Sequence, residues 1–284
     1  MTMHLFRKNM AAGLIPGLFL LLLSGCGLSG FSQNLSDAIM DNPDPATVRE
    51  ALPTFLVTTD ALIASDPENV GRLCSGAELY SAFATLFIEE PDRAQRLVER
   101  AKSYGARALC ADTGTCAVET MEFDSFVTLL NRIDEDQFPS LYAATISWLS
   151  WARQNSDDWS VVANLPKYQA ALAHIVGIDE TFRNGSALVY LGMLKSLRPP
   201  SLGGKPEEGK MYFERAIELS QGRNLAAKVG LARSYARMVY DRDLHDRVLK
   251  EVLAAPVEAP GLTLQNALAK SEAQLLLESA EDYF

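Results

Sequence analysis

Histidine and positive charge are both scarce in this chain. It has three histidines, and its 26 lysine and arginine residues are outnumbered by 36 aspartate and glutamate residues, so the net charge is −10 at pH 7. Binding to nucleic acid or to anionic lipid headgroups depends on clustered lysine and arginine. The charge balance argues against both kinds of partner, and the few histidines offer little material for a metal centre.

Long hydrophobic runs are also missing, except near the start. Residues 11–23 form an apolar run that is too short for a transmembrane anchor, which needs about 20 apolar residues, but that matches the hydrophobic region of a signal peptide. Arg7 and Lys8 precede the run, and Leu23-Ser24-Gly25-Cys26 follows it. Small residues directly before a cysteine are typical of a bacterial lipoprotein signal, and they favour this interpretation over an ordinary secretory signal.

A lipoprotein signal predicts how the chain is organised. Residues 1–25 would be removed as the signal peptide, and Cys26 would carry a diacylglycerol with acyl chains such as palmitate, which hold a protein firmly on a membrane. Residues 26–42 would form the lipidated tether and residues 43–284 an all-helical body. We expect a periplasmic location, with the anchor in the outer membrane, at its periplasmic face, rather than in the inner membrane.

Four cysteines are present, and one of them is assigned to lipidation. Cys110 and Cys116 flank the turn-forming sequence Ala-Asp-Thr-Gly-Thr, so a local disulfide is the simplest assignment in an oxidising compartment. Cys74 lies in an apolar helical pattern and is expected as a buried thiol. A bridge between Cys74 and Cys110, or no bridge at all, are the alternatives.

The apolar residues recur at spacings of three and four, and no segment shows the sustained alternation that strands need. The sequence therefore predicts an all-α fold, in which Pro53 ends or kinks a short first helix. The clearest helix pairs occupy residues 68–88 with 91–105, 186–197 with 206–220, and 225–240 with 241–253.

These pairs resemble tetratricopeptide (TPR) repeats, which are about 34 residues long. A large residue is followed three positions later by alanine, as in Phe213 and Ala216, and small residues let helix axes approach to about 8–10 Å. We expect about four TPR-like pairs, packed with additional helices into a single superhelical body with a cleft or pore.

Two patterns that could suggest chemistry are unconvincing. Residues 204–211 come close to a nucleotide-binding loop, but Met211 stands where a serine or threonine would hold magnesium, and no strand precedes the glycines. His174 is expected at the edge of the core, and His245 in a solvated, charged helix start. We therefore predict no catalytic residue, no metal ligand and no cofactor, and we do not expect an enzyme.

Aromatic residues offer a better candidate site. The five that lie near one another in sequence are Tyr142, Trp148, Trp151, Trp159 and Tyr168. They could belong to the core between repeats, or they could line a ligand channel or a partner-binding surface, because tryptophan and tyrosine are common at both. The sequence leaves this choice open.

Several segments of the chain, which occur in the same order as in the family, resemble the TatT family of tetratricopeptide lipoproteins. These lipoproteins are associated with tripartite ATP-independent periplasmic (TRAP) transporters. The segments are Asp44–Pro53, Asp66–Asn69, Arg93–Ala101, Asp157–Trp159 with Leu165-Pro166, Gly185-Ser186 before Leu191-Gly192, Arg198–Pro200 with Gly203-Gly204, and Asp282–Phe284. The resemblance covers the chain from about Pro43 to Phe284.

The resemblance implies a helical protomer with a pore or cleft, assembled as a homotrimer. It implies docking to a periplasmic TRAP solute-binding protein of the DctP-like kind and help in binding or passing a hydrophobic, lipid-like ligand, without catalysis. The competing hypothesis is a TPR lipoprotein scaffold for outer-membrane or cell-envelope assembly. A TRAP gene beside the gene for this chain would favour the first hypothesis.

Overall fold

A computed structural model describes residues 37–284, and every regular element in this range is helical. The predicted all-α fold with packed helix pairs is confirmed. Cys26, the predicted signal peptide and most of the predicted tether lie outside the described residues. Between residues 37 and 284, no helix is long and apolar enough to cross a membrane.

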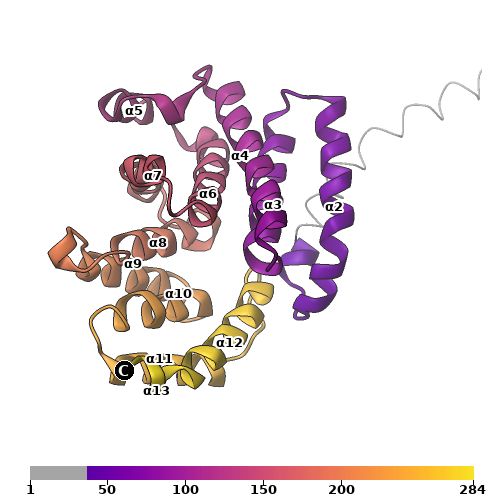
Figure 1. Ribbon diagram of the computed structural model, residues 1–284. Coiled ribbons are helices and arrows are strands. Elements are labelled where there is room, and N and C mark those ends of the chain that lie inside the picture. Colours follow the sequence, from indigo (N-terminus) through magenta and orange to yellow (C-terminus); the bar gives the residue numbers. More distant parts are fainter. Residues whose placement is uncertain (1–36) are drawn as a thin grey trace, which may run out of the picture.

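The helices follow one another around a curve (Figure 1). They are α2 (Pro45–Ser65), α3 (Val70–Phe87), α4 (Pro91–Thr113), η1 (Val118–Thr120), α5 (Phe123–Leu130), η2 (Glu135–Gln137), α6 (Phe138–Gln154), α7 (Trp159–Ile178), α8 (Phe182–Lys195), η3 (Pro200–Leu202), α9 (Pro206–Leu219), α10 (Leu225–Gly230), the π-helix η4 (Leu231–Ala236), α11 (Arg242–Ala254), α12 (Thr263–Glu278) and α13 (Ala280–Tyr283).

The first long helix does not end at Pro53. Asp44 caps α2 by accepting a hydrogen bond from the Ala46 amide at 3.0 Å, and the helix continues through Pro53 to Ser65. The prediction of a short first helix was therefore wrong. Leu52 and Leu56, on either side of the proline, are buried in one core cluster with residues of α3. This packing outweighs the unfavourable helix propensity of Pro53.

α3 and α4 form a tightly packed pair. A Cβ atom at Gly76 of α3 would lie 2.8 Å from the Tyr104 ring of α4. α4 also runs past Gly105, where the sequence suggested its end, and continues to Thr113. A Cβ atom at Gly105 would lie 2.3 Å from the Ser147 hydroxyl of α6, so this glycine permits a close helix crossing and does not terminate the helix.

Asp60 joins the first three helices. Its carboxylate accepts hydrogen bonds from the hydroxyl of Tyr80 at 2.8 Å and from that of Tyr104 at 2.7 Å, and it pairs with Arg100. Burial, together with the hydrogen bond to Asp60, raises the pKa of Tyr104 to about 12. Asp60 is thereby turned towards α3 and α4.

The free energy of unfolding should fall at high pH because of Tyr104. Its pKa is higher in the folded chain than the value of about 10 in unfolded chains, so the folded state favours the protonated phenol. The resulting stabilisation is complete below about pH 10 and is lost as the pH rises towards 12. Melting temperatures measured across this range should fall less steeply for Tyr104→Phe than for the wild-type chain, and parallel falls would contradict the assignment.

Phe213 organises the second set of pairs. Its side chain is fully buried between two glycines of neighbouring helices. A Cβ atom at Gly192 of α8 would lie 2.8 Å from the ring, and one at Gly230 of α10 would lie 2.6 Å from it. The small residues expected at helix crossings therefore surround one large aromatic plug.

α12 closes the curve by returning to the first helices (Figure 1). Leu264 of α12 is buried in the core cluster of α2, α3 and α4, and Leu268 packs against the same cluster. Just before α12, the Gly261 amide donates a hydrogen bond to the Asp41 carboxylate at 2.6 Å. The two ends of the described chain therefore support each other.

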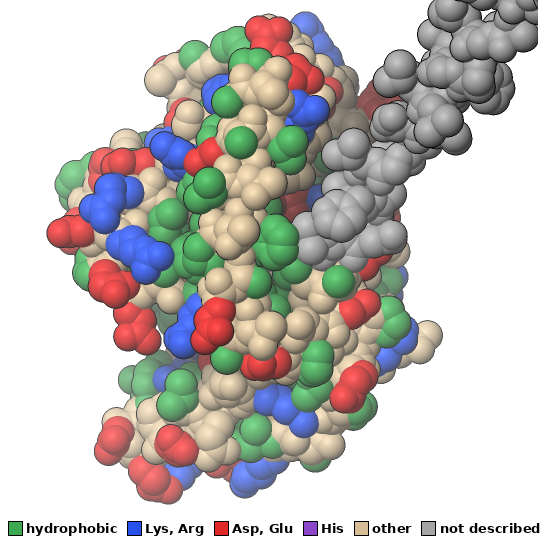
Figure 2. All heavy atoms as spheres, turned by 90° about the vertical axis from the view of Figure 1, so that its right-hand side faces the viewer, with side chains coloured by type: hydrophobic (Ala, Val, Ile, Leu, Met, Phe, Trp, Pro, Cys, Tyr) green, Lys and Arg blue, Asp and Glu red, His purple; other side chains and the backbone are tan. Residues whose placement is uncertain are grey.

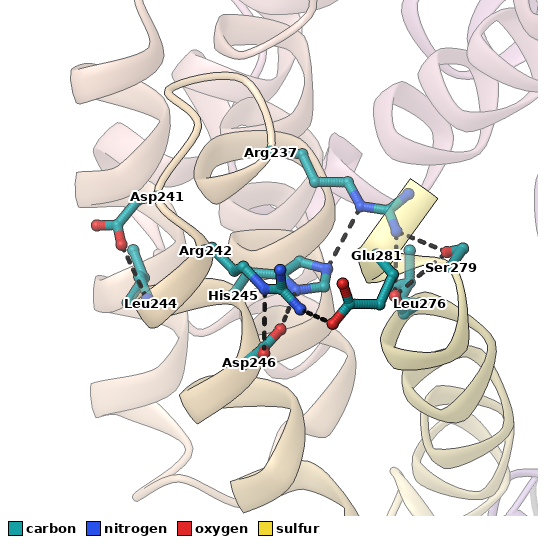
Figure 3. A network of polar contacts seen from close by, with 9 residues as sticks. All are labelled: Arg237, Asp241, Arg242, Leu244, His245, Asp246, Leu276, Ser279 and Glu281. Atoms are coloured by element: carbon teal, nitrogen blue, oxygen red, sulfur yellow. Dashed lines mark hydrogen bonds and ion pairs between the residues drawn. The ribbon is translucent and has the colours of Figure 1, made fainter. Parts of the chain in front are cut away.

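His245 is fully buried, so the expected solvated helix start was wrong at this position. Its Nε2 accepts a hydrogen bond from Arg237 at 3.3 Å, and its Nδ1 lies 2.9 Å from the Asp246 carboxylate (Figure 3). The Phe284 ring packs against it at 5.1 Å, and Arg237 also donates to the Ser279 hydroxyl at 2.7 Å. The C-terminal segment folds back over this histidine and removes it from solvent.

Candidate functional site

The predicted aromatic cluster divides into buried and exposed parts. Trp148 of α6 is only 1% exposed and stacks on the buried Tyr168 of α7, with 5.6 Å between ring centroids. Both rings belong to the same core cluster. Within residues 37–284, neither the indole N–H of Trp148 nor the Tyr168 hydroxyl has a hydrogen-bond partner, and burial raises the pKa of Tyr168.

The other three aromatic side chains lie in different surroundings. Tyr142 is buried, and its hydroxyl lies 2.8 Å from that of Ser186 in α8. Trp151 is partly buried, with the Lys102 ammonium 3.7 Å from the centre of its ring. Trp159, at the start of α7, is 84% exposed. The structure therefore does not gather the five rings on one surface.

A polar cluster joins α3, α6 and α8, and sequence reasoning missed it. The α3–α8 polar cluster consists of Glu78, Tyr142, Arg183, Ser186 and Tyr190. Arg183 donates to the Glu78 carboxylate at 2.9 Å, and these two residues are 105 positions apart in the chain. Such a separation gives no periodic signal. The local hints were Tyr142, which was one of the five candidate aromatic residues, and Gly185-Ser186, which belonged to the family resemblance.

The α3–α8 polar cluster lies next to an unusual backbone turn. Arg183, Asn184 and Gly185 all adopt left-handed conformations, with φ angles of 51°, 55° and 72°. This conformation costs roughly 1–2 kcal/mol for a residue other than glycine. Sparsely populated backbone conformations persist where surrounding contacts hold them, and they concentrate at ligand clamps and other functional sites.

The electrostatics of the cluster favour protonated groups. Burial raises the pKa of Glu78, and the positive charge of Arg183 counteracts part of this rise. Burial also raises the pKa of Tyr190, and the nearby Glu78 charge raises it further. Burial holds the pKa of Tyr142 well above its ordinary value. Both tyrosines therefore keep their protons at neutral pH, so they can donate hydrogen bonds but cannot act as bases.

A groove between α7, α8 and α9 has a volume of about 580 Å³. We call it the α7–α9 groove. Its apolar lining comes from Val176, Leu188, Met211 and Tyr212, and its rim carries Glu180, Glu208, Glu214, Glu218 and Arg215. Arg215 pairs with Glu180 and Glu218, and Lys195 with Glu208. The groove therefore has an apolar floor and a rim of largely compensated charge.

The other residues that the sequence suggested for chemistry take part in contacts that stabilise the fold. His174 hydrogen bonds the Ile133 carbonyl at 2.8 Å. Gly204, in the stretch that resembles a nucleotide-binding loop, packs so closely on Arg198 that a Cβ atom would lie 1.6 Å from that residue's carbonyl oxygen. Between residues 37 and 284, no cluster of histidine, cysteine, aspartate and glutamate suits a metal ion.

The three cysteines of the helical body form one disulfide and one buried thiol. The structure pairs Cys110 with Cys116 as a disulfide, with 4.6 Å between their Cα atoms. Gly114, in a left-handed conformation, ends α4 between them. Cys74 is a buried free thiol, and burial raises its pKa to about 12, so it is a weak nucleophile at neutral pH.

Comparison with known proteins identifies a family for this chain. A family model described as TAtT, TRAP transporter T-component, matches residues 41–284. This range contains every helix from α2 to α13, the α3–α8 polar cluster and the α7–α9 groove. No curated protein matches the chain.

Proposed function

Since the chain belongs to the TRAP transporter T-component family, we propose that it docks the periplasmic solute-binding protein of a TRAP transporter and helps to bind or pass a hydrophobic organic ligand. The family itself establishes an accessory role in TRAP transport, and it confirms the resemblance seen in the sequence. The extent of the match, from residue 41 to residue 284, carries the proposal, because it includes the whole helical body.

Two structural features support a ligand that is mainly hydrophobic. The apolar floor of the α7–α9 groove would accept hydrocarbon, and its volume of about 580 Å³ lies within the usual range of small-molecule sites, about 300–1,000 Å³. Apart from this groove, the α3–α8 polar cluster holds protonated tyrosines that can donate hydrogen bonds to a polar group. Among the described residues, the Tyr190 hydroxyl has no hydrogen-bond partner.

In this proposal the chain binds and does not catalyse. Catalysis needs a group that gains and loses a proton near the working pH or an activated nucleophile. Tyr142 and Tyr190 hold their protons, and the Cys74 thiol is buried with a raised pKa. These groups suit recognition by hydrogen bonding.

The proposal places the protein at a membrane surface in the periplasm. Cys26 would be acylated, and the acyl chains would sit in the periplasmic face of the outer membrane. The body would assemble as a homotrimer, as the sequence resemblance implies. Tethering would hold the docking surfaces on the periplasmic side of that membrane, where a periplasmic solute-binding protein can reach them.

Affinity capture tests the function directly. The tagged, full-length chain would be crosslinked mildly in its own cells, and the recovered partners identified by mass spectrometry. We expect enrichment of a TRAP solute-binding protein of the DctP-like kind. A Cys26→Ser variant is the matched control: it should leave the membrane fraction while its helical body still recovers the same partner.

The competing scaffold hypothesis predicts a different set of partners. Recovery of outer-membrane assembly factors, without any solute-binding protein, would overturn the transport proposal in favour of a scaffold role.

A further inference from the structure

The Arg183 guanidinium has hydrogen-bonding capacity that the fold does not use. A guanidinium carries five N–H donors in a planar fork, and within residues 37–284 Arg183 donates a hydrogen bond to Glu78 alone. Its side chain is 48% exposed, so the remaining donors can be reached from solvent. Arg183 can therefore accept another acidic group, beside Glu78 or in its place.

Glu78 is a poorly stabilised partner for this arginine. The Asp60 carboxylate is held by two tyrosine hydroxyls and an arginine, whereas among the described residues Glu78 accepts a hydrogen bond from Arg183 only. Burial raises the pKa of Glu78, because it penalises the charged form. Separating Glu78 from its arginine would therefore cost the fold less than separating Asp60 from its partners.

A second contact keeps the guanidinium in position. Its central carbon lies 5.8 Å from the centre of the Phe182 ring, a cation–π distance. Phe182 in turn packs edge-on against Tyr142, with 5.6 Å between ring centroids. Arg183 would thus remain directed by its aromatic neighbour when Glu78 is displaced.

Tyr190 places a second unused donor next to the ion pair. The Glu78 charge raises the pKa of Tyr190, so the two groups lie within each other's field, yet this hydroxyl has no hydrogen-bond partner among the described residues. The Tyr190 and Phe182 rings are partly buried and pack against the same core cluster. An acceptor that binds here therefore meets two donors, with apolar rings beside them.

The charge of the cluster limits the charge of its ligand. Arg183 is the only cation in the α3–α8 polar cluster, and a carboxylate matches the fork of a guanidinium. A second carboxylate, or a phosphate monoester with a charge of about −1.5 to −2, would bring more negative charge than one guanidinium compensates. The cluster therefore suits a monocarboxylate.

The rest of the surface gives an anion little reason to bind. The chain has a net charge of −10, and on the face in Figure 2 lysine and arginine side chains lie among aspartate and glutamate side chains. Such mixed charges leave little positive potential. Retention of an anion requires a local arrangement such as the one at Arg183.

We propose that the α3–α8 polar cluster binds the single carboxylate of a mainly hydrophobic ligand, with Arg183 as the anchor, Tyr190 as a second donor and Glu78 as the internal competitor that the ligand displaces. The hydrophobic character of the ligand rests on the proposed function, whereas its carboxylate rests on the cluster alone.

Substitutions on the two sides of the ion pair test the proposal, because they should change binding in opposite directions. Glu78→Gln removes the competitor and should tighten the binding of a carboxylate. Arg183→Gln removes the anchor and should weaken it, each by about tenfold, the usual worth of a hydrogen bond to a charged group. An ion pair with a structural role alone would give changes of the same sign, since both variants break the same bridge.

Hexanoate is the probe, titrated calorimetrically into the full-length chain in mild detergent, with the detergent buffer as the blank. 1-Hexanol has the same carbon chain without the charge, and adipate carries a second carboxylate at the other end. Hexanoate should bind the wild-type chain more tightly than either of them. Binding of 1-hexanol should be the same in the wild-type chain and both variants.

Tyr190→Phe tests the site without disturbing the ion pair. Its hydroxyl has no partner in the described fold, so the melting temperature should not change, while hexanoate binding should weaken by about three- to tenfold. Arg242→Gln is the matched control. The Arg242 side chain is 41% exposed and pairs with Glu281, far from α8 in the chain, and this variant should bind hexanoate like the wild-type chain.

Several results would overturn the inference. These are equal affinity for hexanoate and 1-hexanol, weaker hexanoate binding in both Glu78→Gln and Arg183→Gln, unchanged binding in Tyr190→Phe, and no hexanoate binding by either the wild-type chain or Glu78→Gln. Tighter binding of adipate would reject a site for one carboxylate. Recovery of a solute-binding protein in the capture experiment, together with any of these results, would refute the carboxylate site and leave the docking role intact.

Discussion

Trp148→Ala is expected to lower the free energy of unfolding by about 3–5 kcal/mol, the usual cost of truncating a fully buried aromatic side chain. The ring is 1% exposed and stacks on Tyr168, so its removal would leave a cavity between α6 and α7. Denaturant unfolding followed by circular dichroism measures this change.

Trp159→Ala is the matched control, because this tryptophan is 84% exposed. Its effect should stay within about 0.5 kcal/mol, as for most surface substitutions. The comparison also decides between the two interpretations that the sequence left open. A large loss of stability with unchanged retention of ligand would assign Trp148 to the core. A stable Trp148→Ala protein that loses its ligand would assign it to a binding site.

Phe213→Ala should cost a similar amount, about 3–5 kcal/mol. The ring fills the space between α8, α9 and α10, where Gly192 and Gly230 approach it. Collapse of the helices into the cavity would need the whole second set of pairs to shift. Phe123→Ala, at a residue that is 43% exposed, should have a much smaller effect.

A double-mutant cycle with Gly192→Ala tests the close contact itself. A Cβ atom at Gly192 would lie 2.8 Å from the Phe213 ring, so Gly192→Ala alone should destabilise the chain by about 1–3 kcal/mol through overpacking. In the Phe213→Ala background the added methyl group enters empty space, and the penalty should largely disappear. Additive effects of the two substitutions would show that the glycine is required for another reason.

Helix type and several helix starts could be predicted from the sequence because they depend on local features. The spacing of apolar residues gives the all-α class, and a proline at the first helical position agrees with the beginnings of α4 and α9. Asn69 and Asp158, which were not predicted as caps, begin α3 and α7 by accepting backbone hydrogen bonds. These signals act within one helical turn, so they survive without knowledge of the partner helices.

Pro53 and Gly105 show where local signals fail. Both residues weaken helices in isolation, yet α2 and α4 continue through them. At Pro53 the neighbouring leucines are buried, and at Gly105 the missing side chain admits α6. Tertiary packing supplies most of the stability of a helix in a folded chain, so a helix breaker can be tolerated or even required.

The candidate sites depended still more on the tertiary structure. The sequence by itself determined that the chain is helical, acidic, poor in histidine and similar to one transporter-associated family. Only the fold decided that Trp148 is buried while Trp159 is exposed, that His245 is covered by the C-terminal segment, and that Glu78 meets Arg183 across 105 positions. Composition and helical periodicity are local properties, whereas burial and ion pairing depend on which distant helices pack together, and that follows from the three-dimensional arrangement alone.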